Sequence, residues 1–198
     1  MNVPLPEDRD TMQVASRLIP ISASQFPTIP FPPNDSLEVQ SELKYLMRLQ
    51  SDKKRDLKFA YLVDKDIPAP FLSYCADAGL ECDPNYLKAL VTEAVPLLLT
   101  LKFQYGRPRP RQLAFMYGLD LKPYETKTAD TPSYPSGHAF QAYLIAYVLG
   151  AKYPAHASAL ERIAERVGQS RMDLGLHFPS DVEAGKVFAF QAAQAVAR

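Results

Sequence analysis

Apolar residues recur at helical spacing along most of the chain, and no stretch alternates convincingly with the period of two that a half-buried strand requires. Capping residues, glycines and prolines indicate where the helices begin and end. These signals predict the following helices, in chain order: one from about residue 35, with 53–64 either continuing it or forming a second helix, then 71–78, 84–105, 139–152, 157–167 and 179–197. The chain is therefore predicted to be all-α, a single-domain helical bundle.

Two segments do not fit a helical pattern. Residues 1–33 are rich in proline, and the prolines between 19 and 33 require an extended chain there. We expect residues 1–33 to form a proline-rich N-terminal arm that either wraps the domain or stays mobile, and residues 34–198 to form the helical domain. Residues 106–135 contain five prolines and two glycines, so we expect a long functional loop.

The charge balance limits the kinds of partner. The 198 residues include 22 basic and 22 acidic side chains, so the formal net charge is zero. This balance gives no general attraction to nucleic acid or to an anionic membrane, and we expect no nucleic-acid partner. An anion site would therefore need a local concentration of cations. Such a concentration exists between residues 102 and 111, which include Lys102, Arg107, Arg109 and Arg111 but no acidic residue.

The sequence also bears on the compartment. It contains no run of 18 apolar residues, so we expect no integral membrane segment. The N-terminal residues are acidic and no apolar signal region follows them, so we expect a cytoplasmic protein on the chain as given, or a periplasmic one if a signal peptide has been removed. Without an export signal, Cys75 and Cys82 are expected to be free thiols rather than a disulfide. The oligomeric state stays open, a homo-oligomer included.

Residues 135–138 are the first candidate for chemistry. Ser136, Gly137 and His138 immediately precede a strongly apolar helix, whose first N–H groups are unpaired and carry the positive end of the helix dipole. Such a helix start binds anions, the serine adds a hydroxyl, and the histidine can supply a proton. A capped helix start with a surface histidine would explain the same residues.

A second candidate lies at the start of the last predicted helix. His177 is followed four residues later by Asp181, which can accept a hydrogen bond from one imidazole nitrogen and leave the other nitrogen free to attack. Asp181 could instead serve only as a helix N-terminal charge, or His177, Asp181 and His138 could bind a metal. Lys102, Arg109 and Arg171 would repel a divalent cation at the same site, so the pattern favours a phosphate-like anion and no metal.

For the basic residues and for the third histidine, the sequence gives less specific predictions. Arg109 and Arg171 can hold phosphate oxygens in a forked geometry, and Lys102 can add a point charge. Arg107 and Arg111 are expected to lie behind the site or at the surface. His156 has no partner in the sequence and is expected to be structural or exposed.

Together, the three segments resemble the signature of the type 2 phosphatidic acid phosphatase superfamily, which reads K-x6-RP, PSGH and SR-x5-H-x3-D. Every fixed position is matched in order and spacing: Lys102, Arg109-Pro110, residues 135–138, Ser170-Arg171, His177 and Asp181. The residues around 133–138 and 177–185 look most like the bacterial class A nonspecific acid phosphatases. The superfamily shares this site with vanadium-dependent haloperoxidases.

The resemblance implies a helical bundle with the site at its mouth and a role for each residue. It implies that His177 attacks phosphorus and becomes a phosphohistidine, that Asp181 orients it, and that His138 protonates the leaving oxygen. It further implies phosphoryl binding by Lys102, Arg109, Ser136, Gly137 and Arg171, with no cofactor, although vanadate could bind as a phosphate mimic. The implied activity is metal-independent hydrolysis of a small-molecule phosphate monoester. The alternatives are a vanadate-dependent haloperoxidase and a phosphatase for lipid or isoprenoid (pyro)phosphates.

Overall fold

The computed structural model describes residues 3–124, 126 and 129–196, and every regular element in this part of the chain is a helix. The α-helices are α1 (Pro6–Met12), α2 (Leu37–Ser51), α3 (Leu57–Lys65), α4 (Ala69–Asp77), α5 (Pro84–Glu93), α6 (Val95–Tyr105), α7 (Pro110–Met116), α8 (Gly137–Lys152), α9 (Ala157–Asp173) and α10 (Pro179–Ala195). The prediction of an all-α fold is confirmed.

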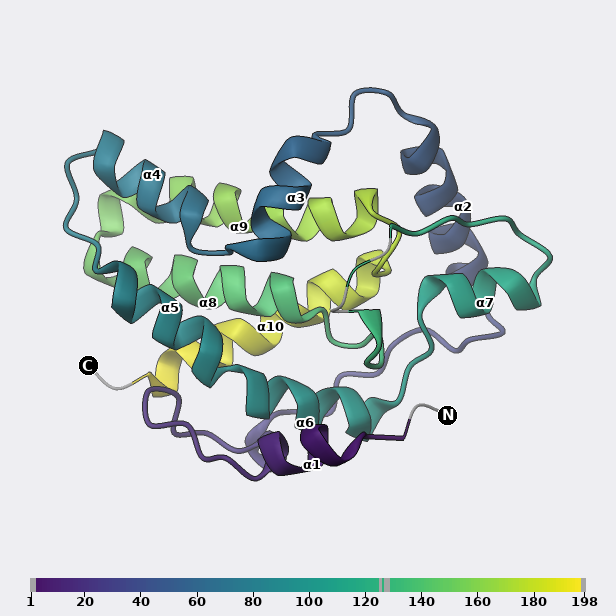
Figure 1. Cartoon of the computed structure of the whole chain (residues 1–198), viewed down its shortest axis with the longest axis horizontal. Helices are drawn as coiled ribbons and strands as arrows, with labels where there is room; N and C mark the ends of the chain where they lie inside the picture. Colours follow the sequence, from purple (N-terminus) through teal and green to yellow (C-terminus); the bar gives the residue numbers. More distant parts are fainter. Residues whose placement is uncertain (1–2, 125, 127–128, 197–198) are drawn as a thin grey trace.

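Helix α8 forms the centre of the bundle. It packs along both α9 and α10, and α5 also contacts it, as Figure 1 shows. Most of its residues are buried, because apolar side chains cover all sides of this helix rather than one stripe. Because the starts of α8 and α10 lie together, both carry functional segments to the same end of the bundle.

Several predicted boundaries differ from the observed ones. The helix predicted at 84–105 is two helices, since Pro96 has no N–H to continue the first one. The predicted loop at 106–135 contains α7, which begins where Arg109 meets Pro110, a favourable first helical residue. Helix α9 continues past residue 167 to Asp173, and the predicted last residue of α10 at 197 lies outside the described residues.

The N-terminal residues lie against the bundle. Glu93 at the end of α5 accepts hydrogen bonds from Ser16 Oγ at 2.9 Å, Arg17 N at 2.7 Å and Leu18 N at 2.8 Å. Phe26 packs edge-on against Phe188 of α10, with ring centroids 5.4 Å apart. Residues 16–26 are therefore held by both hydrogen bonds and apolar contacts, and the short helix α1, which the prolines had not suggested, packs on α6.

The prediction of free thiols is wrong. Cys75 and Cys82 form a disulfide that joins the end of α4 to the segment before α5. Gly79, with φ of 67°, turns the chain back after α4, so the two Cα atoms are 6.2 Å apart. The absence of a recognisable export signal was a weaker guide than this local turn.

We expect the disulfide to stabilise the fold. Closing this short loop lowers the conformational entropy of the unfolded chain, which stabilises the folded state by about 2–3 kcal/mol. Replacing both cysteines by alanine should lower the free energy of unfolding by about that amount, as measured by urea denaturation. An equal effect of dithiothreitol on the native protein, and none on the double variant, would tie the loss to the disulfide. Unchanged stability in the variant would contradict the prediction.

No helix among the described residues combines the length and the apolar character needed to cross a lipid bilayer.

Candidate active site

The start of α8 is held against the start of α10. Ser136, the N-cap residue of α8, is fully buried, and its amide donates to the carbonyl of Asp181 at 2.9 Å. Gly185 on α10 permits this approach, because a Cβ there would lie 2.8 Å from the Ser136 carbonyl oxygen. Gly137 lies beside the Lys102 side chain, whose Cε would be 3.7 Å from an added Cβ. The N-terminal end of α8 therefore faces the segment that carries His177 and Asp181.

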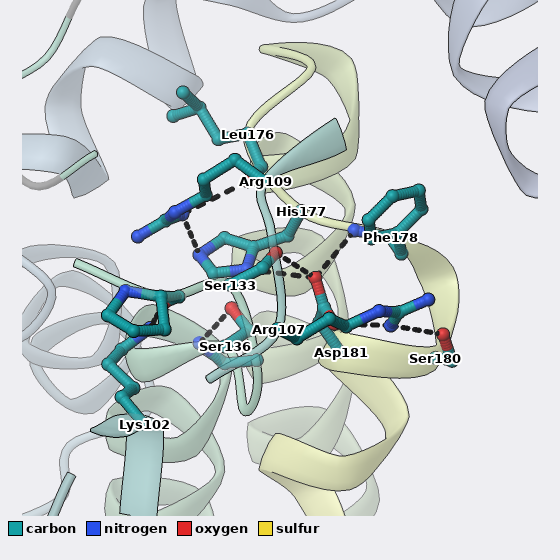
Figure 2. Close-up of polar contacts among 12 residues, drawn as sticks. Lys102, Arg107, Arg109, Ser133, Ser136, Leu176, His177, Phe178, Ser180 and Asp181 are labelled. Atoms are coloured by element: carbon teal, nitrogen blue, oxygen red, sulfur yellow. Dashed lines mark hydrogen bonds and ion pairs between the residues drawn. The ribbon is translucent and has the colours of Figure 1, made fainter. Parts of the chain in front are cut away.

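His177 is oriented through its Nδ1 atom. Nδ1 lies 3.3 Å from Asp181 Oδ2, one turn into α10, as Figure 2 shows. The same carboxylate oxygen accepts from Phe178 N at 2.9 Å and from the Ser133 hydroxyl. A carboxylate in this position requires a proton on Nδ1, which leaves the lone pair on Nε2.

Asp181 is charged although no part of its side chain is exposed. Burial alone would raise its pKa, but the hydrogen bond with His177 and the charge of Arg107 lower the pKa far below its ordinary value. Arg107 Nη1 lies 2.5 Å from Asp181 Oδ1, and Arg107 Nη2 lies 3.1 Å from Glu42 of α2. The buried guanidinium thus holds the carboxylate that orients His177.

The other nitrogen of His177 faces cations. Arg109 Nη1 lies 2.9 Å from His177 Nε2 and also donates to the Leu176 carbonyl at 3.0 Å. Figure 2 shows the imidazole between Arg109 on one side and Asp181 on the other. Burial, followed by the charge of Arg109, lowers the pKa of His177 well below its usual range, so the imidazole is neutral and its lone pair is available.

Lys102 supplies a second cation from the last turn of α6. Its ammonium group is buried and donates to the Pro132 carbonyl at 2.8 Å. Among the described residues, no carboxylate forms an ion pair with it. Burial, and then the neighbouring charge of Arg109, lower the pKa of Lys102 well below its usual value. A bound anion would reverse this shift, so the lysine favours an anionic ligand.

Arg171 supplies a third cation and two unsatisfied donors. It is 1% exposed, and its Nη2 donates to Asp64 Oδ1 at 2.8 Å. Its Nε and Nη1 atoms are buried and have no hydrogen-bond partner in the described part of the chain. Leaving a buried charged donor unpaired costs more than about 1–3 kcal/mol, which oxygen atoms of a bound anion would recover.

His138 is a buried imidazole that contacts Asp64 of α3. Its Nε2 is 3.7 Å from Asp64 Oδ1. Burial first, and then the charges of Arg171 and His177, lower its pKa well below the ordinary value. The site therefore contains two imidazoles with different partners: His177 faces Asp181 and His138 faces Asp64.

The structure brings together all eight residues that the sequence singled out for the site. They come from the three recognised segments: Lys102, Arg109, Ser136, Gly137, His138, Arg171, His177 and Asp181. His156 lies elsewhere, 2.8 Å from the Tyr74 hydroxyl, as a structural histidine. Arg107 is behind the site and fully buried, whereas Arg111 is exposed.

Three contributors were not found from the sequence: Glu42, Asp64 and Ser133. Glu42 and Asp64 belong to α2 and α3, far from the recognised segments, and nothing in their neighbouring residues distinguishes them from surface acids. Ser133 had one signal, its position three residues before Ser136. All three became visible only through contacts with buried charges.

The donor set does not suit a metal ion. No three His, Cys, Asp or Glu residues in the described part of the chain are grouped so that they could hold one. Asp181 is engaged by Arg107 and Asp64 by Arg171, so each carboxylate already has a cation. A phosphate-like anion fits the remaining donors better than a divalent cation does.

A pocket of about 1020 Å³ adjoins the site on the Arg109 side. Its lining includes Gln112 and Phe115 of α7, Tyr124 of the following loop, and Leu176 immediately before His177. Phe115 is 85% exposed, so this wall presents an aromatic face to solvent rather than to the core. The pocket has room for a group attached to an anion held by Arg109.

Fold and candidate site together define an all-α bundle in which an imidazole–carboxylate pair lies beside three buried basic side chains. The chain belongs to the PAP2 superfamily, whose family model matches residues 85–198. The family resemblance predicted from the three segments is thereby confirmed.

Known proteins agree with this assignment. The chain is 37% identical over 103 residues to the non-specific acid phosphatase of Salmonella typhimurium strain LT2, which covers 52% of this chain and 41% of that protein. It is 39% identical over 85 residues to the non-specific acid phosphatase of Salmonella typhi, which covers 43% of this chain and 34% of the relative. The matched regions thus span less than half of these curated relatives.

The fold is also similar to a solved structure, the first transmembrane PAP2 type phosphatidylglycerolphosphate phosphatase from Bacillus subtilis. The TM-score is 0.51 at 22% identity, and the alignment covers 81% of this chain and 85% of the other. This similarity supports the assignment of the fold and nothing beyond the fold.

Proposed function

We propose that the protein is a metal-independent phosphatase that hydrolyses phosphate monoesters through a phosphohistidine intermediate. The observation that carries this proposal is the setting of His177. Its Nδ1 is tied to a charged Asp181, and its Nε2 faces Arg109. A neutral, oriented imidazole beside a cluster of cations is suited to attack a phosphoryl group.

In the first step, the phosphoryl oxygens accept hydrogen bonds from Arg171 Nε and Nη1, Lys102 and the start of α8. Arg109 turns from His177 Nε2 to a phosphoryl oxygen, because the single lone pair on Nε2 cannot both accept its hydrogen bond and attack. A bond then forms between Nε2 and phosphorus while the bond to the leaving oxygen breaks. The imidazolium of His138 gives its proton to that oxygen, and Asp181 stabilises the charge on His177.

In the second step, water attacks the phosphorus of the phosphohistidine. His138, now neutral, takes a proton from the water as the phosphorus–Nε2 bond breaks. Inorganic phosphate leaves, and both imidazoles return to their starting protonation states. The fixed cations neutralise the equatorial oxygens in both steps, which is the role that metal ions have in other phosphoryl-transfer enzymes.

The proposal is tested by assaying hydrolysis of an aryl phosphate in the presence of EDTA. We expect kcat/KM to be unchanged by the chelator, because Lys102, Arg109 and Arg171 provide the charge that a metal would otherwise supply. Vanadate should inhibit competitively, since it takes the place of the phosphoryl group. Absence of hydrolysis, or its loss with EDTA and recovery on adding a divalent metal, would overturn the proposal.

The adjoining pocket of about 1020 Å³ can hold the organic part of a phosphate ester. Phe115 and Tyr124 suit an apolar or planar group, and Gln112 offers an amide for a polar one. We propose that the ester part of the substrate occupies this pocket while its phosphate contacts Arg109.

The disulfide bears on the compartment. Disulfides persist in oxidising compartments and are uncommon in the cytosol. The Cys75–Cys82 disulfide therefore supports the second of the two expected locations, outside the cytoplasm, and we propose that the protein acts there.

A further inference from the structure

Asp64 reaches the site from a helix that none of the three recognised segments includes. It lies near the end of α3, which packs across α9, as Figure 1 shows. One carboxylate oxygen, Oδ1, is 2.8 Å from Arg171 Nη2 and 3.7 Å from His138 Nε2. Thr126 Oγ1 donates to the same carboxylate, at 3.3 Å from Oδ1 and 3.1 Å from Oδ2. Asp64 thus connects a phosphate-binding arginine with the histidine proposed as the acid.

The contact with Arg171 determines which of its donors face the site. Asp64 takes up Nη2, while Nε and Nη1 stay buried and unpaired. A guanidinium is planar and rigid, so fixing one nitrogen at a carboxylate restricts the directions of the other two. Arg171 is therefore anchored at Nη2 by Asp64, while its other two nitrogens keep unpaired donors that an anion could engage.

The contact with His138 addresses a charge problem in the proposed mechanism. His138 must be an imidazolium to give a proton to the leaving oxygen, yet it is buried among cations. The groups that face it are Arg171 of α9, Lys102 of α6, His177 and Asp64 of α3. A hydrogen bond to the Asp64 backbone raises the pKa of His138, and the Asp64 carboxylate, 3.7 Å from Nε2, adds the one negative charge among these four groups.

We propose that Asp64 is a positioning residue for phosphoryl transfer, anchoring Arg171 beside the phosphoryl group and favouring the protonated form of His138 as the leaving-group acid. This inference rests on the proposed phosphatase activity. It predicts two separable consequences of losing the carboxylate. Arg171 should bind the phosphoryl group of every substrate less well, and kcat/KM should fall further for substrates whose leaving oxygen needs a proton.

The first test is the kinetics of Asp64→Asn with two substrates. An alkyl phosphate has a poor leaving group that requires general acid catalysis, worth about 10²-fold or more, whereas p-nitrophenyl phosphate does not. We expect the ratio of kcat/KM for the alkyl over the aryl ester to fall by about 10²-fold. The descending limb of the pH profile for the alkyl ester should move to lower pH by about one unit, because the imidazolium loses its counter-charge.

Asp56→Asn is the matched control. It removes one carboxylate from the other end of α3, where Asp56 pairs with exposed Arg166, and asparagine caps a helix as well as aspartate does. The control should keep the wild-type ratio and pH profile. Asp64→Glu, which keeps the charge on a longer side chain, should give a descending limb between those of wild type and Asp64→Asn.

The second test does not depend on activity. The chain has three histidines, so ring-labelled protein gives an NMR titration in which His138 is identified by comparison with His138→Gln. The His138 resonance should titrate at lower pH in Asp64→Asn than in wild type or Asp56→Asn. Should Asp64→Asn not fold, the same comparison with Asp64→Glu decides the question.

These results separate the two proposals. If wild type hydrolyses no phosphoester but the His138 titration shifts, the proposed function fails and the electrostatic role of Asp64 stands. If wild type is active while the Asp64 variants keep both the wild-type substrate ratio and the wild-type His138 titration, the inference about Asp64 is overturned and the function stands.

Discussion

His177→Ala is expected to lower kcat/KM for an aryl phosphate by about 10⁴-fold or more, a loss comparable with removing the nucleophile of other covalent enzymes. The variant lacks the Nε2 atom that bonds to phosphorus, and the other imidazole of the site, His138, has the leaving-group acid role in the proposed mechanism. Water could attack directly, but it would do so without an oriented nucleophile. The cations would still bind and polarise the phosphoryl group, so a small residual rate is expected.

Binding should persist when turnover is lost. Lys102, Arg109 and Arg171 do not depend on His177 for their own positions, since each is held by other contacts. Calorimetry with inorganic phosphate should therefore give an affinity for His177→Ala within about tenfold of wild type, a difference of about 1.4 kcal/mol. Loss of binding together with activity would mean that His177 organises the site rather than attacks.

His156→Ala is the control for this experiment. It also removes one imidazole, but from a position beside Tyr74 and outside the site. Its turnover should match that of wild type. Near-normal turnover in His177→Ala, or accumulation of 32P-labelled phosphoenzyme in that variant, would show that the nucleophile has been assigned to the wrong residue.

Arg107→Met is expected to lower the free energy of unfolding by about 3–5 kcal/mol at neutral pH. Arg107 is fully buried between two carboxylates, Asp181 on α10 and Glu42 on α2. Methionine keeps much of the side-chain volume but removes the charge. Two carboxylates are then left without the cation that offset their desolvation, which is the expensive case for a buried ion pair.

The loss should become smaller in acid. In wild type the pKa of Asp181 is lowered in the folded state, so its stabilising contribution is present above the unfolded pKa of about 3.9 and is lost as the pH falls. Without Arg107 this lowering is reduced, so protonation costs the variant less. Urea denaturation at pH 7 and at about pH 2.5, which lies below the unfolded pKa of about 3.9, should show the two proteins converging in stability.

Arg111→Met is the matched control for charge removal in the same segment. Arg111 is exposed, and such surface substitutions usually change stability by less than about 0.5 kcal/mol. Equal effects of the two substitutions would contradict the role given to Arg107. A large loss in Arg107→Met that does not change with pH would instead indicate packing around the guanidinium, which lies over the rings of Phe31 and Phe178.

The sequence predicted helix starts correctly where neighbouring residues alone determine them. Helix α8 is predicted within two residues of its observed start because a serine cap precedes a long apolar run. The start of α10 at Pro179 follows from the conformation that proline favours in a first helical turn. The errors occur at prolines, because a proline can end one helix or begin another. Pro96 divides a predicted helix into two, and Pro110 begins a helix inside an expected loop.

The cysteines show the same limit. Two thiols with six residues between them can either stay separate or meet, and the outcome depends on the direction of the chain between them. The left-handed turn at Gly79 brings them together. Compartment reasoning alone predicted the opposite, because it ignored this geometry.

By itself, the sequence determined the helical class, the starts of α8 and α10 and the eight candidate residues that the structure brings together, since spacing and residue type carry that information. His177 and Asp181 face one another because they are four residues apart at a helix start, which is a local property. Only the tertiary structure decided which charges are paired. Arg107 and Arg111 are alike in sequence, yet one is buried against Asp181 and the other is exposed. Asp64 and Glu42 became part of the site because α2 and α3 pack beside it, and electrostatic interactions depend on distance in space rather than on distance along the chain.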